Sequence, residues 1–332
     1  MRAVRARRRG AAAARYDRAA MRAVTVRDSQ IVVDEHRDPV AQAGEVLVRV
    51  RAAGVNGADI LQMRGRYPAP PGSPPDIPGL EFAGEVVECG PGAQRFEPGD
   101  RVMSVVGGGG QAELIAVHER LAMPVPEDLD WTAAGGVPEV FTTAHDALFT
   151  QARLRAGERL LVHGAAGGVG VAAVQLGTMA GARVTATVRD DHAREQIAAL
   201  GANAIPPDGF EQQGPFDVVL ELVGAPNMPT NLQALAPLGR ICVIGISAGA
   251  KAELNLALLM AKRGAIHAST LRARSLEDKA VAARAVERYV LPGFAAGDLS
   301  VPVTAEFPLE RAPEAYERFQ AGGKLGKIVI TM

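Results

Sequence analysis

The sequence has few cysteines and no long apolar run free of glycine. Only two of its 332 residues are cysteine, Cys89 and Cys242, which is too few for a disulfide framework or a cysteine-rich zinc site. This scarcity is typical of a protein of the reducing cytoplasm. The longest stretch without Asp, Glu, Lys or Arg, residues 160–182, is long enough to cross a bilayer, but it contains six glycines and is interpreted as strand, turn and helix. The composition therefore indicates neither a secreted nor a membrane protein.

The chain also lacks the excess of positive charge that attracts nucleic acid or an anionic membrane. Lys and Arg number 36 against 37 Asp and Glu, a formal net charge of −1. Residues 1–20 hold seven arginines and one aspartate, but no apolar segment typical of a secretory signal and no serine. We expect residues 1–20 to be a disordered extension or the product of a misassigned start codon.

The spacing of apolar residues divides the rest of the chain into two regions. Residues 21–140 contain short alternating segments, such as residues 45–51, separated by Pro-Gly turns, which predicts a barrel-like β-rich domain. From Trp131 a helix is predicted over residues 132–151, and apolar strands then alternate with helices, which predicts an α/β fold with a doubly wound parallel sheet. The predicted strands cover residues 159–163, 183–188, 217–221 and 239–245, and the helices between them cover residues 169–180, 191–200 and 228–235.

The C-terminal part returns to the first domain in this prediction. A long helix is expected over residues 276–289, and an apolar strand over residues 327–330 follows too long an excursion to join the parallel sheet. We therefore expect a β-rich domain over residues 21–140, a Rossmann domain over residues 141–275 and a C-terminal return over residues 276–332.

A glycine-rich turn follows the first strand of the predicted parallel sheet. Residues 164–170 read Gly-Ala-Ala-Gly-Gly-Val-Gly and open a helix, the context of a dinucleotide-binding fingerprint with Ala165 in the first glycine position. Small residues let the backbone approach a pyrophosphate, whose charge meets free N–H groups at the helix start. The cofactor contacts expected here are Gly167, Gly168, Val169 and Gly170. The alternative is a turn with only a packing role.

The end of the second strand favours NADPH over NADH. Residues 184–188 contain no acidic residue for the ribose hydroxyls of NADH, whereas Arg189 and Arg194 follow and can bind a 2′-phosphate. Asp190 and Asp191 lie beside Arg189 and weigh against this assignment. In the alternative, both arginines belong to a solvated helix start.

Five dispersed motifs lie at residues 53–59, 64–68, 78–84, 108–113 and 269–272. Together they resemble the medium-chain dehydrogenase/reductase superfamily, and within it the zinc-independent, zeta-crystallin-like NADPH:quinone oxidoreductases. The resemblance implies a GroES-like catalytic domain, a Rossmann domain, NADPH as cofactor, and a homodimer that pairs through an edge strand, expected at residues 241–247 together with the following segment at residues 251–258. The apolar run at residues 254–260 suits such an interface, and in the alternative it is an internal helix. It also implies that no zinc is bound, because zinc-dependent relatives carry Cys and His where this chain has Asn56 and Leu80.

The same resemblance implies roles for single residues. Asn56 and Tyr67 match positions that line the nicotinamide and substrate cleft, where Asn56 holds the ribose or a carbonyl oxygen and Tyr67 donates a hydrogen bond to the acceptor. In the alternative, Asn56 is a turn residue and Tyr67 only packs at the surface. Further cofactor contacts are implied at Thr142, Gly245, Ile246, Ser247, Leu271, Arg272 and Lys327. The alternatives are that Arg272 is solvated and that Lys327 pairs with a surface acid.

The function implied is cytoplasmic, zinc-free reduction of a small-molecule quinone by hydride from NADPH. One alternative is NADPH-dependent reduction of an enone, an alkenal or an enoyl thioester, which needs the same cofactor and a differently shaped cleft. Another is an NADPH-binding sensor or structural protein with little turnover, since a fold alone does not establish activity.

Overall fold

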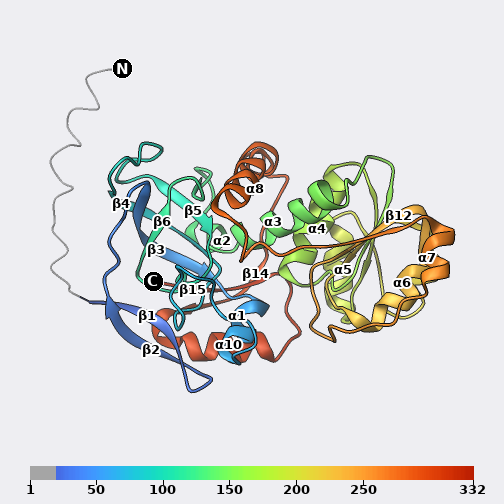
Figure 1. Ribbon diagram of the computed structural model, residues 1–332, viewed down its shortest axis with the longest axis horizontal. Helices are drawn as coiled ribbons and strands as arrows, with labels where there is room; N and C mark the ends of the chain where they lie inside the picture. Colours follow the sequence, from blue (N-terminus) through green and yellow to red (C-terminus); the bar gives the residue numbers. More distant parts are fainter. Residues whose placement is uncertain (1–19) are drawn as a thin grey trace.

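The computed structural model describes residues 20–332, and these form a β-rich part and a parallel α/β part with helices between them (Figure 1). Apart from Ala20, the extension predicted at residues 1–20 lies outside the described residues. None of the helices within residues 20–332 combines the length and apolarity needed to cross a membrane.

The β-rich part is built on a seven-stranded sheet. Strand β3 is central because it pairs with β4, β6 and the C-terminal strand β15. Its residues alternate between buried and half-buried, which is the pattern expected of a strand with one face toward the core. The strands are β3 (Glu45–Gly54), β4 (Glu81–Cys89), β5 (Arg101–Val105), β6 (Leu114–His118), β7 (Met123–Pro124), β14 (Val303–Pro308) and β15 (Lys327–Thr331), and a separate hairpin is formed by β1 (Ala20–Arg27) and β2 (Gln30–Arg37).

The C-terminal strand lies in the sheet of the β-rich part. Strand β15 pairs antiparallel with β3, with Val329 opposite Gly54, and parallel with β14. Figure 1 shows the C-terminus and helix α10 (Ala312–Gln320) beside the N-terminal hairpin. Residues from both ends of the chain therefore share one part of the molecule.

The α/β part is a six-stranded parallel sheet, which confirms the predicted doubly wound architecture. Its order is β10-β9-β8-β11-β12-β13. The strands are β8 (Arg159–Val162), β9 (Arg183–Thr187), β10 (Asn203–Ile205), β11 (Phe216–Glu221), β12 (Leu235–Val243) and β13 (Ala265–Ala268). The helices among them are α4 (Gly168–Met179), α5 (Asp191–Ala199), α6 (Met228–Ala234) and α7 (Leu256–Lys262), with short 3-10 turns at Phe210–Gln213 and Ala225–Asn227. A third 3-10 turn, Leu309–Arg311, lies in the β-rich part between β14 and α10.

The edge strand of this sheet differs from the prediction. The segment expected at the edge, residues 241–247, begins within β12, which lies between β11 and β13. The edge is β13, a strand of four residues that is too short to show a periodic pattern in the sequence. The apolar residues Leu256 and Met260 of the neighbouring helix α7 are exposed.

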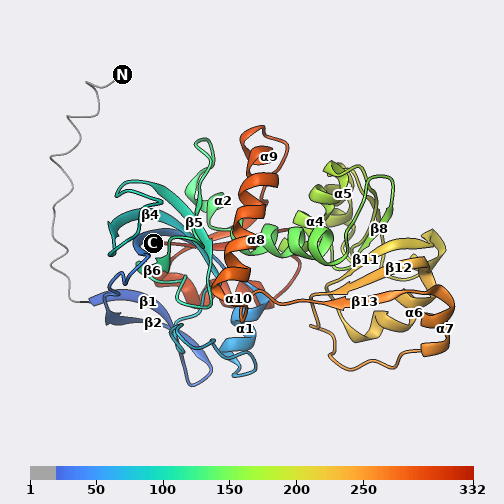
Figure 2. The same cartoon turned by 45° about the horizontal axis from the view of Figure 1, so that its top comes forward.

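Three further helical segments connect the two parts. The single helix predicted over residues 132–151 is divided into α2 (Trp131–Ala134), α3 (Pro138–His145) and a π-helix (Asp146–Gln151). The break follows from local chemistry, because Gly135 and Gly136 disfavour a helix and Pro138 is tolerated only in a first turn. Figure 2 shows α8 (Leu276–Tyr289) between the two parts, with α9 (Leu291–Ala295) following it, while α1 (Gly57–Met63) lies at the end of β3.

Candidate active site

A buried polar cluster lies where three elements of the β-rich part meet. Lys327, the first residue of β15, places its Nζ 2.5 Å from Oε1 of Glu81 and 2.7 Å from Oδ1 of Asn56. Glu81 begins β4, and Asn56 precedes helix α1 just after β3. The Nδ2 of Asn56 donates to the same Oε1 of Glu81 at 2.9 Å. Lys327 and Glu81 thus form a buried ion pair, and both ends of the Asn56 amide are engaged within the cluster.

Asp59 fixes the backbone around this cluster. Its carboxylate accepts hydrogen bonds from the backbone N–H of Asn56 at 2.8 Å and of Gly79 at 3.1 Å, and from Nε2 of Gln111 at 3.4 Å. Tyr316 on α10 in turn donates to Oε1 of Gln111 at 2.8 Å. Burial raises the pKa of Asp59 to about 6. These contacts fix the backbone of the turn that carries Asn56.

Glu139 extends the cluster toward the helices that join the two parts. Its backbone N–H donates to Oε2 of Glu81 at 2.7 Å, and its own carboxyl accepts from Oγ1 of Thr143 at 3.3 Å. Burial, reinforced by the neighbouring Glu81 carboxylate, raises the pKa of Glu139 to about 7. The cluster therefore holds three carboxyl groups against one lysine.

We expect the Glu139→Gln variant to be more stable than the parent protein at pH 8.5 but not at pH 4.5. The folded state binds the Glu139 proton more tightly than the unfolded chain does, so ionisation costs stability as the pH rises from about 4.3 to about 7. The gain at pH 8.5 should be on the order of 3 kcal/mol. Urea unfolding at both pH values measures it.

Glu211 provides a control because it is exposed in the 3-10 turn Phe210–Gln213. Glu211→Gln should leave stability nearly unchanged at both pH values. A Glu139→Gln variant that loses stability at pH 8.5, or gains equally at both pH values, would contradict the expected cost of the buried carboxylate.

The donor set of this cluster does not fit a catalytic zinc ion. Asn56 contributes an amide and Leu80 an apolar side chain, and neither replaces a thiolate or an imidazole as a zinc ligand. Within residues 20–332, no group of three or more His, Cys, Asp or Glu side chains is arranged to hold a metal ion. The cluster is a set of hydrogen-bonding and ionisable groups.

Tyr67 and Arg272 lie together beside this cluster. The Tyr67 hydroxyl is 3.1 Å from Oγ1 of Thr270, and the Arg272 guanidinium lies 4.8 Å from the centroid of the Tyr67 ring. Arg272 is 4% exposed and donates to the carbonyls of Tyr67 at 2.8 Å and Gly107 at 2.7 Å, and to Oε1 of Gln62. The structure therefore turns Arg272, expected as a cofactor contact, toward the loops of the β-rich part.

The glycine-rich turn lies between β8 and α4. A Cβ on Gly170 would lie 2.5 Å from Cα of Ala165, so this position requires glycine for the close approach of turn and helix. The C-terminal segment crosses this turn, because the N–H of Gly326 donates to the carbonyl of Ala166 at 2.9 Å. Gly167 caps α4, which begins with Gly168 and Val169. Lys327, one residue after Gly326, thus lies near the turn.

The other residues expected to contact the cofactor follow the carboxyl ends of β9 and β12. Arg189 is exposed after β9, whereas Arg194 donates to the carbonyl of Val188 at 3.0 Å and pairs with Asp191. Residues 245–247 follow β12, with Ile246 and Ser247 exposed, and a Cβ on Gly245 would lie 2.3 Å from the carbonyl oxygen of Leu222. Because the strands are parallel, these segments and the glycine-rich turn all lie at the carboxyl ends of the strands. Open α/β sheets bind ligands at this end.

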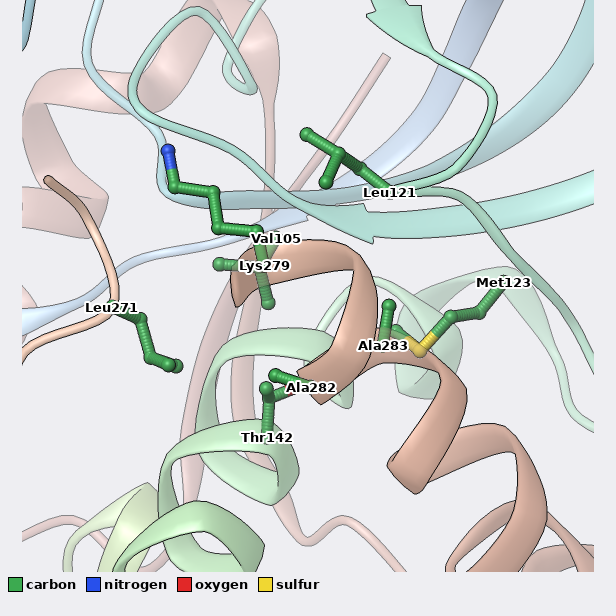
Figure 3. Close-up of a pocket in the computed structure, with 8 residues that line it drawn as sticks. All are labelled: Val105, Leu121, Met123, Thr142, Leu271, Lys279, Ala282 and Ala283. Carbon is green, nitrogen blue, oxygen red and sulfur yellow. The ribbon is translucent and has the colours of Figure 1, made fainter. Parts of the chain in front are cut away.

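A small pocket between the two parts contains Thr142 and Leu271 (Figure 3). Thr142, on α3, is 4% exposed, and its buried Oγ1 has no hydrogen-bond partner among residues 20–332. An unpaired buried hydroxyl is costly unless a ligand completes its hydrogen bond, so Thr142 fits a polar group of a bound cofactor or acceptor. The pocket is lined by Val105, Leu121, Met123, Thr142, Leu271, Lys279, Ala282 and Ala283.

Several functional candidates were missed in the sequence. Glu81, Glu139 and Lys279 were not assigned roles, although Glu81 lies within the motif at residues 78–84. Glu81 stands between the apolar residues Leu80 and Phe82, which was a usable signal, since a buried carboxylate needs a partner.

Comparisons with known proteins match both parts of the chain. Residues 42–127 match the family described as "Alcohol dehydrogenase GroES-like domain", and residues 200–330 match the family described as "Zinc-binding dehydrogenase". The chain is 32% identical over 310 residues to a quinone oxidoreductase of Rattus norvegicus, an alignment that covers 89% of this chain and 91% of that protein. The expected GroES-like domain is thereby confirmed.

Two other relatives widen the comparison. The polyketide synthase GfsB of Streptomyces halstedii is 33% identical over 297 residues, which is 88% of this chain but 5% of the synthase. The crystal structure of an alcohol dehydrogenase superfamily protein from Novosphingobium aromaticivorans gives a TM-score of 0.82 at 27% identity, covering 94% of this chain and 99% of that chain. The two parts of the chain therefore occur together in these relatives.

Proposed function

Because this chain belongs to the zeta-crystallin-like quinone oxidoreductases of the medium-chain dehydrogenase/reductase superfamily, we propose that it is an NADPH-dependent, zinc-free quinone reductase. The observation that supports this proposal is the donor set at the positions where the resemblance implies zinc ligands. These positions hold Leu80 and Asn56, and the Asn56 amide is engaged by Lys327 and Glu81 in the buried cluster. Without a Lewis acid, oxidation of an alcohol loses its usual driving force, whereas reduction of an electrophilic acceptor does not need one.

In the proposed reaction, the residues of this chain bind the cofactor and orient the acceptor. When bound, NADPH supplies a hydride from nicotinamide C4, and the quinone also gains a proton to form a hydroquinone. The glycine-rich turn and the start of α4 provide N–H groups for the pyrophosphate. Tyr67 carries a hydroxyl that can donate to the carbonyl oxygen under reduction. Asn56 acts within the buried cluster, where its amide bridges Lys327 and Glu81.

The preference for NADPH over NADH is part of this proposal. It is supported by the absence of an acidic side chain in β9 and by Arg189, whose exposed guanidinium follows that strand. An acidic residue there would repel a 2′-phosphate, whereas an arginine can bind it with charge-assisted hydrogen bonds.

The first test measures oxidation of NADPH and NADH by purified protein without added zinc. The acceptors are an ortho-quinone, a para-quinone and a simple enone. We expect NADPH-dependent quinone reduction with kcat/KM of at least about 10⁴ M⁻¹s⁻¹, the lower end of the usual enzymatic range. Turnover that requires added zinc, or no turnover despite NADPH binding, would sink the proposal.

Reduction of a carbon–carbon double bond is the second candidate. The match to the polyketide synthase favours it, because a segment of that synthase aligns with 88% of this chain. The two candidates share the cofactor and differ in the acceptor, so a higher kcat/KM for the enone than for both quinones would decide for the second.

We also propose that the protein is a cytoplasmic homodimer. The pairing surface would be the edge strand β13 with helix α7, where Leu256 and Met260 are 65% and 76% exposed. Large exposed apolar side chains at a sheet edge are typical of an interface. The two free cysteines, Cys89 and Cys242, support a reducing compartment.

A further inference from the structure

Lys279 lines the pocket between the two parts, and its ammonium has no partner in the described part of the chain. It lies near the start of α8, is half-buried, and lines the pocket together with Thr142 and Leu271. No hydrogen bond or ion pair formed by its ammonium is present within residues 20–332. The stem of Lys279 is packed against the pocket while its ammonium stays accessible to solvent, so the ammonium is free to bind an anion at the pocket rim.

The charges around Lys279 do not compensate for its burial. Burial lowers the pKa of Lys279, and the positive charge of Arg272 lowers it further. The nearby carboxylates of α8 are engaged elsewhere, since Glu277 pairs with Arg120 and Asp278 accepts a hydrogen bond from the Ser275 hydroxyl at 2.7 Å. Arg272 therefore adds positive charge near the Lys279 ammonium, and no carboxylate within residues 20–332 pairs with that ammonium.

The other walls of the pocket are apolar. Val105 and Met123 from β5 and β7, Leu121 and Leu271 from loops, and two alanines of α8 surround it. Figure 3 shows Thr142 pointing up into this space from α3 and the nitrogen of Lys279 at the rim, away from Thr142 and Met123. An apolar centre thus lies between the buried Thr142 hydroxyl and the Lys279 ammonium, neither of which has a hydrogen-bond partner within the described residues.

We infer that Lys279 is the anion-binding end of the acceptor site, so that the protein prefers acceptors whose apolar body carries a carboxylate or sulfonate. The inference rests on the proposed function and adds to it the class of acceptor. A charged oxygen offers the ammonium a stronger hydrogen bond than a neutral carbonyl does, and it offsets the positive charge that Lys279 shares with Arg272. Apolar walls meanwhile suit an aromatic or aliphatic body.

The glycine-rich turn provides the separate anion site expected for the cofactor. The pyrophosphate site lies at the start of α4, which the C-terminal segment contacts through Gly326, whereas Lys279 lies on α8 against β5 and β7. Loss of the Lys279 charge should therefore weaken binding of an anionic acceptor and leave the dissociation constant of NADPH unchanged.

The test compares 1,2-naphthoquinone with its 4-sulfonate in the parent protein and in Lys279→Met and Lys279→Arg. In Lys279→Met we expect kcat/KM for the sulfonate to fall about tenfold or more, mainly because KM rises. For the uncharged 1,2-naphthoquinone, kcat/KM should change less than about twofold. Lys279→Arg should stay close to the parent protein. For each protein we divide kcat/KM for the sulfonate by kcat/KM for 1,2-naphthoquinone. Comparing this sulfonate-to-quinone ratio between a variant and the parent protein removes the different intrinsic reactivities of the two quinones.

Lys251→Met is the matched control, because Lys251 is exposed outside the pocket and its loss changes the net charge equally. An unchanged sulfonate-to-quinone ratio in Lys279→Met overturns the inference, as does an equal drop in Lys251→Met, which would indicate only long-range attraction. A weaker NADPH affinity in Lys279→Met with an unchanged ratio also overturns it and assigns Lys279 to the cofactor.

Binding without turnover separates this inference from the proposed function. Calorimetry on NADP⁺-saturated protein compares 2-naphthoate with the neutral 2-naphthamide, and we expect Lys279→Met to weaken only the naphthoate, by about tenfold. If neither quinone is reduced, the proposed function fails while this measurement still decides on Lys279. Equal naphthoate affinity in the parent protein and Lys279→Met, or no naphthoate binding at all, overturns the inference.

Discussion

Replacing Lys327 with methionine is expected to reduce the free energy of unfolding by about 3–5 kcal/mol, the usual cost of breaking a buried ion pair from one side. Lys327 is 2% exposed and Glu81 is 0% exposed, so the variant leaves a carboxylate without its cation in the interior. Asn56 also loses the hydrogen bond that its Oδ1 accepts from Lys327. Urea unfolding at pH 7.5 measures the effect.

A double-variant cycle tests whether the loss comes from the pair. Glu81→Gln alone leaves Lys327 buried and unpaired, whereas Glu81→Gln combined with Lys327→Met removes both charges and should recover at least about 2 kcal/mol of the summed losses. Lys251→Met, at an exposed position, should cost less than about 0.5 kcal/mol. Single-variant losses that simply add would show that Glu81 and Lys327 contribute independently, which contradicts the buried pair.

Elements with a complete local pattern were predictable from the sequence. The helix expected over residues 276–289 is α8 with the same bounds, because apolar positions at helical spacing follow the N-cap Ser275. The glycine-rich turn was found because its glycines are consecutive with the strand and the helix that define its context. The edge strand β13 was missed because four residues between loops carry no such pattern.

The buried cluster was not predictable because its members are distant in sequence. Lys327 and Glu81 are 246 residues apart, and only the pairing of β15 with β3 and of β3 with β4 brings them together. Each residue alone is typical of a solvated surface. The orientation of Arg272 was missed for the same reason, since its acceptors Tyr67 and Gly107 lie about 200 and 165 residues earlier.

Replacing Arg272 with methionine is expected to lower kcat/KM for the quinone by about 100-fold, the cost of misplacing a reacting group by about 1 Å. Arg272 joins the segment after β13 to two loops of the β-rich part, through the carbonyls of Tyr67 and Gly107 and the side chain of Gln62. Its loss leaves these buried acceptors unpaired and frees the Tyr67 loop. Steady-state kinetics with NADPH and the quinone measures the effect on kcat and on KM.

The Tyr67→Phe variant distinguishes positioning from a direct contact with the cofactor. If Arg272 acts by holding Tyr67, most of its effect depends on the Tyr67 hydroxyl, and Arg272→Met in the Tyr67→Phe background should cost less than about tenfold. Arg272→Lys should recover little, because one ammonium cannot replace a planar guanidinium that reaches three acceptors. The opposite outcome is that the fold-losses in kcat/KM of the two single variants multiply in the double variant and that NADPH binds more weakly. This outcome would assign Arg272 to the cofactor, because a contact with the bound nucleotide changes the dissociation constant of NADPH without involving Tyr67.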